Sequence, residues 1–156
     1  MRYDENGGRL PSVYDDSILG FFGSYRFLSN FQPCTIVMDG LVFSSSEAVY
    51  MSRKTEKPEI KKEFTLLTPS QARKHGQEIE LSDPVAWEFD RVIAMYDACW
   101  AKFTQNDELR HALINTGTKR LEETNDWGDK FWGADQFGNG RSMLGKVLMS
   151  IRGKLK

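Results

Sequence analysis

The sequence has few of the residues that build disulfides, metal sites or membrane spans. Its two cysteines, Cys34 and Cys99, stand far apart in apolar surroundings, which favours buried free thiols in a reducing cytoplasm over a disulfide. Its two histidines, His75 and His111, are not spaced with another ligand, so we expect no metal site. No apolar run approaches the roughly 18 residues of a membrane span, and the N-terminal residues lack the apolar core of a signal peptide. These absences predict a cytoplasmic protein without a membrane partner.

The charge shows no surplus of either sign. Lys and Arg number 21 against 22 Asp and Glu, which gives a formal net charge of −1. A protein that binds DNA mainly through its phosphates usually carries a basic surplus. A nucleic acid remains an open substrate, but the field of the whole molecule would not attract it. With 40% hydrophobic and 28% charged residues, the chain is typical of one water-soluble domain with its own core.

Several catalytic motifs are also missing. The sequence has no phosphate-binding P-loop, no Gly-x-Ser-x-Gly nucleophile elbow and no dinucleotide fingerprint. The stretch Gly138-Asn139-Gly140 is too short to count as a phosphate loop. We therefore expect no cofactor and a chemistry based on carboxylates, aromatic rings, Asn, Arg and Lys.

The order of local patterns predicts an α+β domain. Residues 1–16 are polar and without periodicity, so they are interpreted as an N-terminal extension of a single domain at 17–156. Two β-prone runs, 34–38 and 41–43, flank Asp39-Gly40, which predicts a hairpin with a type I′ turn. The remaining patterns are mostly helical. The predicted fold is a predominantly helical α+β domain in which several helices pack a small sheet or hairpin.

Helix signals follow the hairpin. Ser44 and Glu47 have the spacing of a capping box, and Pro58 and Pro69 are typical of the first turns of two short helices. Further helices are predicted over 84–105, from about 107 to 116 and over 142–155, with a short strand within 118–124. On the long helix, the apolar residues predicted to face the core are those that return at three- and four-residue steps: Val85, Phe89, Val92, Ile93, Tyr96, Trp100 and Phe103.

The first candidate site lies at the start of the helix after the hairpin. Glu47, Tyr50 and Lys54 fall at i, i+3 and i+7, which places a carboxylate, a phenol and an amine on one helix face. Such a face could bind and act on a polar substrate. The alternative is that Glu47 only completes a capping box and that Lys54 is solvated.

The second candidate is the loop 125–133, which holds Trp127, Phe131 and Trp132 beside Asp129. Aromatic side chains are costly to expose, so these rings must pack on something. Aromatic rings next to carboxylates suit recognition of a flat base or a sugar. The alternative is a loop that plugs the core with its own rings.

Two weaker candidates contain arginine. Trp87 and Arg91 stand four residues apart on the long helix, where Arg91 could bind a carboxylate or phosphate, or only form a surface salt bridge. Arg26 and Asn30 lie in a run of alternating polar and aromatic residues before the hairpin. They could hold a phosphate or a ring edge, although Asn30 could equally be a turn residue.

Taken in order, these residues resemble the NADAR family, also called YbiA-like. The resemblance rests on Phe27-Leu28-Ser29-Asn30-Phe31, Pro33-Cys34, Asp39-Gly40, Phe43, Ser46-Glu47, Tyr50 and Lys54. It continues through Trp87, Arg91, Met95, Lys102-Phe103, Asn106, Leu109, Thr116-Gly117, Leu121-Glu122, Asp129, Trp132-Gly133 and the C-terminal stretch 144–152. It covers the chain from about residue 18 onward. One departure is that Ala48 and Met51 stand where the family commonly has His and Gln, so a histidine acid at position 48 cannot be essential here.

The resemblance implies an N-glycosidase, a hydrolase that cleaves a bond between a ribose carbon and a base-like nitrogen. Similar proteins are associated with early riboflavin-pathway intermediates that carry ribose 5-phosphate, and with ADP-ribose attached to guanine in DNA. Both remain open as substrates here. The near-neutral charge favours a small phosphoribosyl-amine or a single ADP-ribosyl group over a long stretch of DNA.

The resemblance also implies roles for the candidate residues. Glu47 and Asp129 would be the carboxylates, and Lys54 would be a rival catalyst that attacks the sugar carbon. The residues implied to bind substrate are Arg26, Asn30, Tyr50, Trp87, Arg91, Trp132 and Gly133. Two other classes of function stay open: a non-catalytic module that binds ADP-ribose or a nucleotide, and an interaction domain anchored by Trp127 and Phe131.

Overall fold

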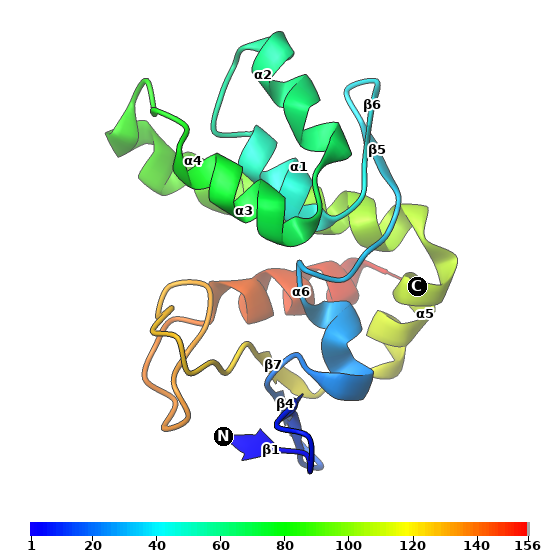
Figure 1. Ribbon diagram of the computed structural model, residues 1–156. Helices are drawn as coiled ribbons and strands as arrows, with labels where there is room; N and C mark the ends of the chain where they lie inside the picture. Colours follow the sequence, from blue (N-terminus) through cyan, green and yellow to red (C-terminus); the bar gives the residue numbers. More distant parts are fainter. Residues whose placement is uncertain (156) are drawn as a thin grey trace. The chain divides into compact units, whose positions relative to one another are not determined.

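The computed structural model describes residues 1–155, which form two compact units (Figure 1). Unit 1 combines Met1–Ser29 with the chain from His111 onward, and unit 2 is Asn30–Arg110. Helix α5 (Asp107–Asn115) spans the boundary between them in the sequence. No helix among residues 1–155 is long and apolar enough to cross a bilayer.

Unit 2 is mostly helical. Its elements are β5 (Ile36–Met38), β6 (Leu41–Phe43), α1 (Ser46–Ser52), α2 (Pro58–Glu63), the 3-10 helix η2 (Phe64–Leu66), α3 (Pro69–Gln77) and α4 (Pro84–Gln105). The β5–β6 hairpin turns at Asp39 and Gly40, whose φ angles of 52° and 76° are those of a type I′ turn, so the predicted hairpin is confirmed. Helix α1 packs against both α3 and α4 (Figure 1).

Helix α4 has the predicted bounds, but only part of its predicted buried face is correct: Phe103 is buried, as predicted, and Val92 and Tyr96 are half-buried. Val85, Phe89 and Ile93 are 72%, 73% and 61% exposed, so most of the predicted apolar stripe lies outside the core. The buried residues are Ala94, Met95, Ala98, Cys99, Ala101, Lys102 and Phe103. The prediction was wrong for the exposed residues because it followed large apolar side chains, whereas most of the buried residues of this helix are small.

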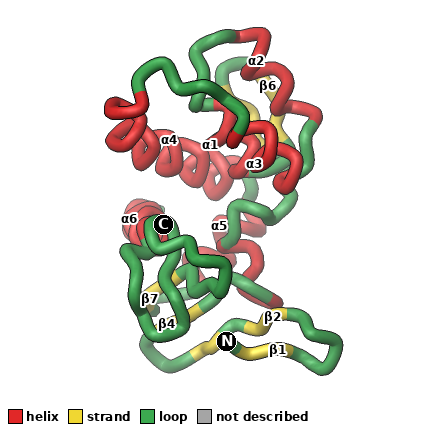
Figure 2. Tube along the Cα trace, turned by 60° about the vertical axis from the view of Figure 1, so that its left-hand side comes forward, coloured by secondary structure: helices red, strands yellow, loops and turns green. Residues whose placement is uncertain are grey.

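Unit 1 is built around a small mixed sheet. Its elements are β1 (Arg2–Tyr3), β2 (Arg9–Leu10), β3 (Ser12–Val13), β4 (Ser17–Leu19), the 3-10 helix η1 (Gly23–Leu28), β7 (Arg120–Glu122) and α6 (Met143–Lys154). Strand β4 pairs with β3 antiparallel and with β7 parallel, and α6 packs on β7 (Figure 2). Gly145 allows this close packing because a Cβ there would lie 2.0 Å from the Leu121 carbonyl oxygen.

The N-terminal residues, for which the sequence predicted no elements, carry the short β1–β2 hairpin and β3. The division into an extension at 1–16 and a domain at 17–156 stays a prediction. The α+β class with mostly helical content is confirmed. Both cysteines are free, as predicted, but only Cys99 is fully buried and Cys34 is half-buried.

Candidate active site

Glu47 is the second residue of α1 and does not close a capping box. The N-cap is Ser45, whose Oγ accepts a hydrogen bond from the Ala48 amide at 3.1 Å. The predicted cap, Ser44, is wrong by one residue, and its hydroxyl instead donates to the Leu67 carbonyl at 2.9 Å. The Glu47 side chain is only 7% exposed. The interpretation that Glu47 serves merely as a helix cap is therefore excluded.

Asn30 fixes the start of α1. Its backbone carbonyl accepts a hydrogen bond from the Glu47 amide at 3.3 Å, and its side-chain Oδ1 accepts one from the Ser46 hydroxyl at 2.9 Å. Its Nδ2 lies 3.0 Å from the sulfur of Met95. The buried amide thus connects α1 to α4. Direct contact between Asn30 and a substrate stays a prediction.

Lys54 follows α1 and is held by α3. Its ammonium donates a hydrogen bond to the Gly76 carbonyl at 2.6 Å. Burial lowers the pKa of Lys54, and the nearby negative charge of Glu47 partly opposes this shift. Gly76 is needed here because a Cβ would lie 2.3 Å from the sulfur of Met51. Glu47 and Lys54 are therefore electrostatic neighbours on a tightly packed helix pair.

Trp87 on α4 and Lys54 line the same pocket, which has a volume of about 270 Å³. The Trp87 ring also packs on Tyr50, with 5.7 Å between centroids and 37° between planes. Tyr50 itself is 6% exposed and is part of the hydrophobic core. In unit 2, an aromatic ring and an amine thus line one pocket, and the buried carboxylate of Glu47, which is not itself a lining residue, interacts electrostatically with that amine. This is the combination expected of a site for a polar ring compound.

Arg91 forms an ion pair with Glu88, with 2.8 Å between Nη2 and Oε2. The partner lies three residues earlier on the same helix, which is the salt bridge that the sequence left open for Arg91. The pocket wall includes Asp90 and Trp87 but not Arg91. A role for Arg91 in substrate binding stays a prediction.

In unit 1, Asp129 shapes its own loop. Its Oδ1 accepts hydrogen bonds from the amides of Phe131 at 3.1 Å and Trp132 at 2.9 Å. The side chain of Asn125 bonds to both backbone groups of Asp129, at 3.2 Å to the amide and 2.8 Å to the carbonyl. Oδ2 of Asp129 has no hydrogen-bond partner among residues 1–155. One carboxylate oxygen therefore stabilises the turn, and the second can accept a hydrogen bond from water or a ligand.

The aromatic residues of this loop are not plugged into the core. Trp127 is 44% exposed, and Phe131 and Trp132 are half-buried. The rings of Phe131 and Trp132 meet edge to face at 4.8 Å. Gly133 is buried, and a Cβ there would lie 2.3 Å from the Asn125 side chain and 2.4 Å from the Glu123 carbonyl. The structure thus assigns Gly133 a packing role.

Arg26, also in unit 1, is exposed on η1.

Lys102 was not predicted as a special residue and is fully buried. Burial lowers its pKa from 10.5 to about 8, while Cys99 and Cys34 act in the opposite direction. Its ammonium lies 4.9 Å from the centroid of the Phe103 ring. The only sequence signal for it was its place among the residues that carry the family resemblance.

Comparison with known proteins decides the family. Residues 20–156 match the NADAR domain. The chain belongs to the NADAR family.

Relatives of this NADAR chain include proteins of similar length and longer ones. It is 30% identical over 151 residues to the N-glycosidase YbiA of Escherichia coli, with 94% of each chain covered. It is 34% identical over 134 residues to a riboflavin biosynthesis protein of Vibrio vulnificus, which covers 85% of this chain but only 36% of that protein. The NADAR chain therefore spans about a third of the Vibrio protein.

The NADAR fold is also found among solved structures. The solution structure of E. coli YbiA superposes with a TM-score of 0.80 at 28% identity, covering 92% of this chain and 87% of that chain. The resemblance inferred from the ordered sequence motifs is thereby confirmed in both sequence and fold.

Proposed function

We propose that this NADAR chain is an N-glycosidase, a hydrolase that cleaves the ribose C1′–N bond of a phosphoribosyl-amine or of ADP-ribosylated guanine. The observation that carries the proposal is the pocket lined by Trp87 and Lys54, together with the buried Glu47, whose charge raises the pKa of Lys54. A relative that matches along nearly its whole length is itself named an N-glycosidase.

The chemistry of C1′–N cleavage calls for these groups. As the bond breaks, positive charge develops on the ribose ring, and a carboxylate near C1′ stabilises that charge or activates water. We assign this role to Glu47. The departing base needs a flat surface, which the Trp87 ring provides at the pocket wall. Water supplies the hydroxyl at C1′, and the base nitrogen leaves with a proton.

In unit 1 we assign the second carboxylate of the reaction to Asp129. Its Oδ1 is bound by two loop amides, which keeps the carboxylate oriented and leaves Oδ2 to meet a sugar hydroxyl, water or a proton. Trp132 would contribute to base or sugar recognition. The exposed Arg26 would bind a substrate phosphate.

Lys54 supports an alternative first step. A lowered pKa increases the fraction of neutral amine at neutral pH, and a neutral amine is a nucleophile. It would attack C1′ as the base leaves, the ring oxygen would then open to give an imine, and water would release the sugar and regenerate the amine. Borohydride reduces such an imine to a stable adduct on Lys54.

One experiment tests the activity and separates it from simple binding. The protein is incubated with a 5-phosphoribosyl-amine of a pyrimidine and, separately, with an ADP-ribosylated guanine oligonucleotide, and the released sugar is identified by mass spectrometry. We expect free ribose 5-phosphate or free ADP-ribose. Tight binding of either compound without release would contradict the glycosidase and favour a non-catalytic binding module.

The two mechanisms separate in the same assay. Borohydride added during turnover gives a sugar adduct on Lys54 if the amine is the nucleophile. Undiminished turnover with no adduct rejects the amine and leaves the carboxylate route.

A further inference from the structure

The N-terminal residues fold into a short hairpin that lies outside the part of the chain matching the family. Arg2 pairs with Leu10 and Tyr3 with Arg9. The turn between the strands is closed by Asp4, whose Oδ1 accepts hydrogen bonds from the amides of Asn6 at 2.8 Å and Gly8 at 2.7 Å. The NADAR match begins only at residue 20. The hairpin is thus a locally stabilised element that lies N-terminal to the residues matched by the family model.

Both strands of this hairpin bind the same carboxylate. The Tyr3 hydroxyl donates to Oδ2 of Asp126 at 2.6 Å. The guanidinium of Arg9 forms a two-pronged contact, with Nη2 at 2.9 Å from Oδ1 and Nε at 3.2 Å from both carboxylate oxygens. Hydrogen bonds from Arg9 and Tyr3 hold the pKa of Asp126 below its usual range. Three strong donors thus converge on one loop residue.

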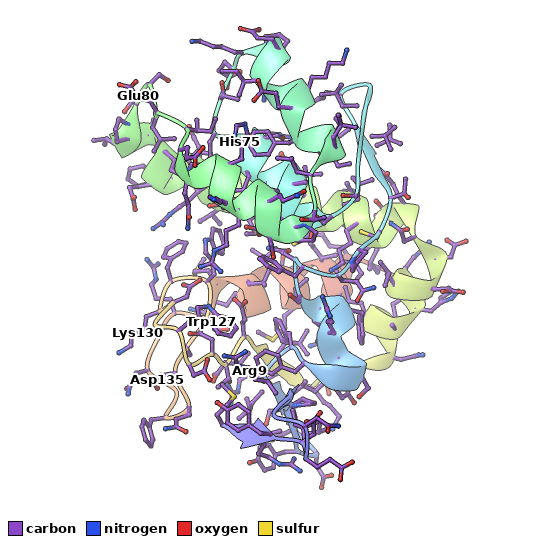
Figure 3. All side chains as sticks on the ribbon, in the orientation of Figure 1. Arg9, His75, Glu80, Trp127, Lys130 and Asp135 are labelled. Atoms are coloured by element: carbon purple, nitrogen blue, oxygen red, sulfur yellow. The ribbon has the colours of Figure 1, made fainter. Side chains whose placement is uncertain are left out.

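The next loop residue, Trp127, is also held by side-chain contacts. Arg9 lies beside Trp127 (Figure 3), with its guanidinium 5.2 Å from the centroid of the ring. The Phe22 ring meets the same ring edge to face at 6.2 Å. The ring is nevertheless 44% exposed, so it is held at the surface by these contacts. Asp126 and Trp127 lie between Asn125 and Asp129, the two residues whose mutual hydrogen bonds define the loop.

We propose that the N-terminal hairpin is a strap that positions the loop 125–133, with Arg9 and Tyr3 as positioning residues that act through Asp126. The strap limits how far residues 126–128 can move and so keeps Asp129 and Trp132 in a fixed orientation. Its effect on loop order does not depend on any activity, whereas its effect on catalysis rests on the proposed function.

The contacts suit local ordering better than global stabilisation. The side chains of Arg9 and Asp126 are 42% and 31% exposed, and ion pairs of this exposure add little to the free energy of unfolding. A two-pronged ion pair combined with a phenol and a ring contact still restricts a loop that would otherwise open locally. Because salt screens exposed charges, the restriction weakens at high ionic strength.

The test is hydrogen exchange of the Phe131 and Trp132 amides, which bond to Asp129. Arg9→Ala and Tyr3→Phe should each speed exchange of these amides by roughly fivefold, while amides of α4 and the melting temperature stay unchanged. Arg2→Ala is the matched control, since Arg2 lies in the same hairpin and its side chain donates to the Pro11 carbonyl instead of Asp126. Equal exchange in Arg9→Ala and wild type would overturn the strap.

Activity of the same variants tests the positioning role. Arg9→Ala should lower kcat/KM by about tenfold, because even a small displacement of a catalytic group slows the reaction. Arg9→Lys should restore part of the loss, and Arg2→Ala should have no effect. Faster loop exchange with unchanged kcat/KM would refute positioning but keep the strap. A wild-type protein without glycosidase activity would refute the proposed function and leave the exchange result standing.

Discussion

The two segments that carry the candidate carboxylates are built in different ways. Glu47 sits in the first turn of a buried helix, where the backbone and the Ser45 cap set its position. Asp129 sits in a half-exposed loop that its own carboxylate folds by accepting two amide hydrogen bonds. A substitution at Glu47 can therefore change chemistry with the fold intact, whereas a substitution at Asp129 preserves the loop only if the new side chain keeps an oxygen for the two amides.

Glu47→Gln should separate chemistry from structure most clearly. The carboxylate route predicts a fall in kcat of about 10²- to 10⁴-fold, with little change in melting temperature, since the amide keeps the same shape. The lysine route predicts a different result. Glu47 raises the pKa of Lys54, so its removal would lower that pKa further and shift the pH–rate profile to lower pH. Steady-state kinetics across pH 5–9 distinguish the two outcomes.

The pH dependence of stability tests whether the Lys102 ammonium is buried inside unit 2. Its pKa of about 8 lies below the ordinary 10.5, so between these values the unfolded chain binds more protons than the folded one. Stability should therefore rise with pH across this window, by on the order of 3 kcal/mol in full, and be constant below it. Lys102→Met should lack this rise. Parallel urea unfolding curves for the two proteins from pH 7.5 to 9.5 would contradict the buried ammonium.

Gly133→Ala tests how tightly the loop 125–133 of unit 1 is packed. The added methyl meets the Asn125 side chain and the Glu123 backbone at distances that require a shift, so we expect a loss of about 2 kcal/mol in stability. Activity should fall with it, because the same shift moves Trp132. Gly128→Ala is the reciprocal case: Gly128 has a positive φ of 85°, which Gly133 does not, but open space around the added methyl, so this variant reports backbone strain without crowding. A Gly133→Ala variant as stable as the wild type would contradict the crowding, whatever the Gly128 variant loses to backbone strain.

Two substitutions, Asp129→Asn and Asp129→Ala, separate the charge of Asp129 from its role as a hydrogen-bond acceptor in the loop. Asn keeps an oxygen for the two loop amides but removes the charge, whereas Ala removes both. We expect Ala to cost about 1 kcal/mol of stability and Asn much less, while both lose activity. Thermal unfolding and initial rates measure the two effects. An active Asn variant would remove Asp129 from the chemistry and leave it as a turn residue.

Local patterns predicted the elements well where the physics is local. The Asp39-Gly40 turn and the bounds of α4 follow from residues next to one another in the chain. The ordered residues from Phe27 to Arg152 were enough to indicate the family and, through it, the candidate residues. The same reasoning failed for Ser44: the S-x-x-E spacing belongs to Ser44 and Glu47, but the packed helix begins at Ser46 and is capped by Ser45.

What the sequence by itself determined is therefore the set of elements, the family and the residue types available for chemistry. The tertiary structure decided which of those residues share an environment. It buried Lys102 and the small face of α4 while leaving Phe89 exposed. It lowered the pKa of Lys54 beside Glu47, and it bound Arg9 to Asp126, 117 residues away in the chain. Burial and charge proximity arise from contacts between distant segments, and no local pattern encodes them.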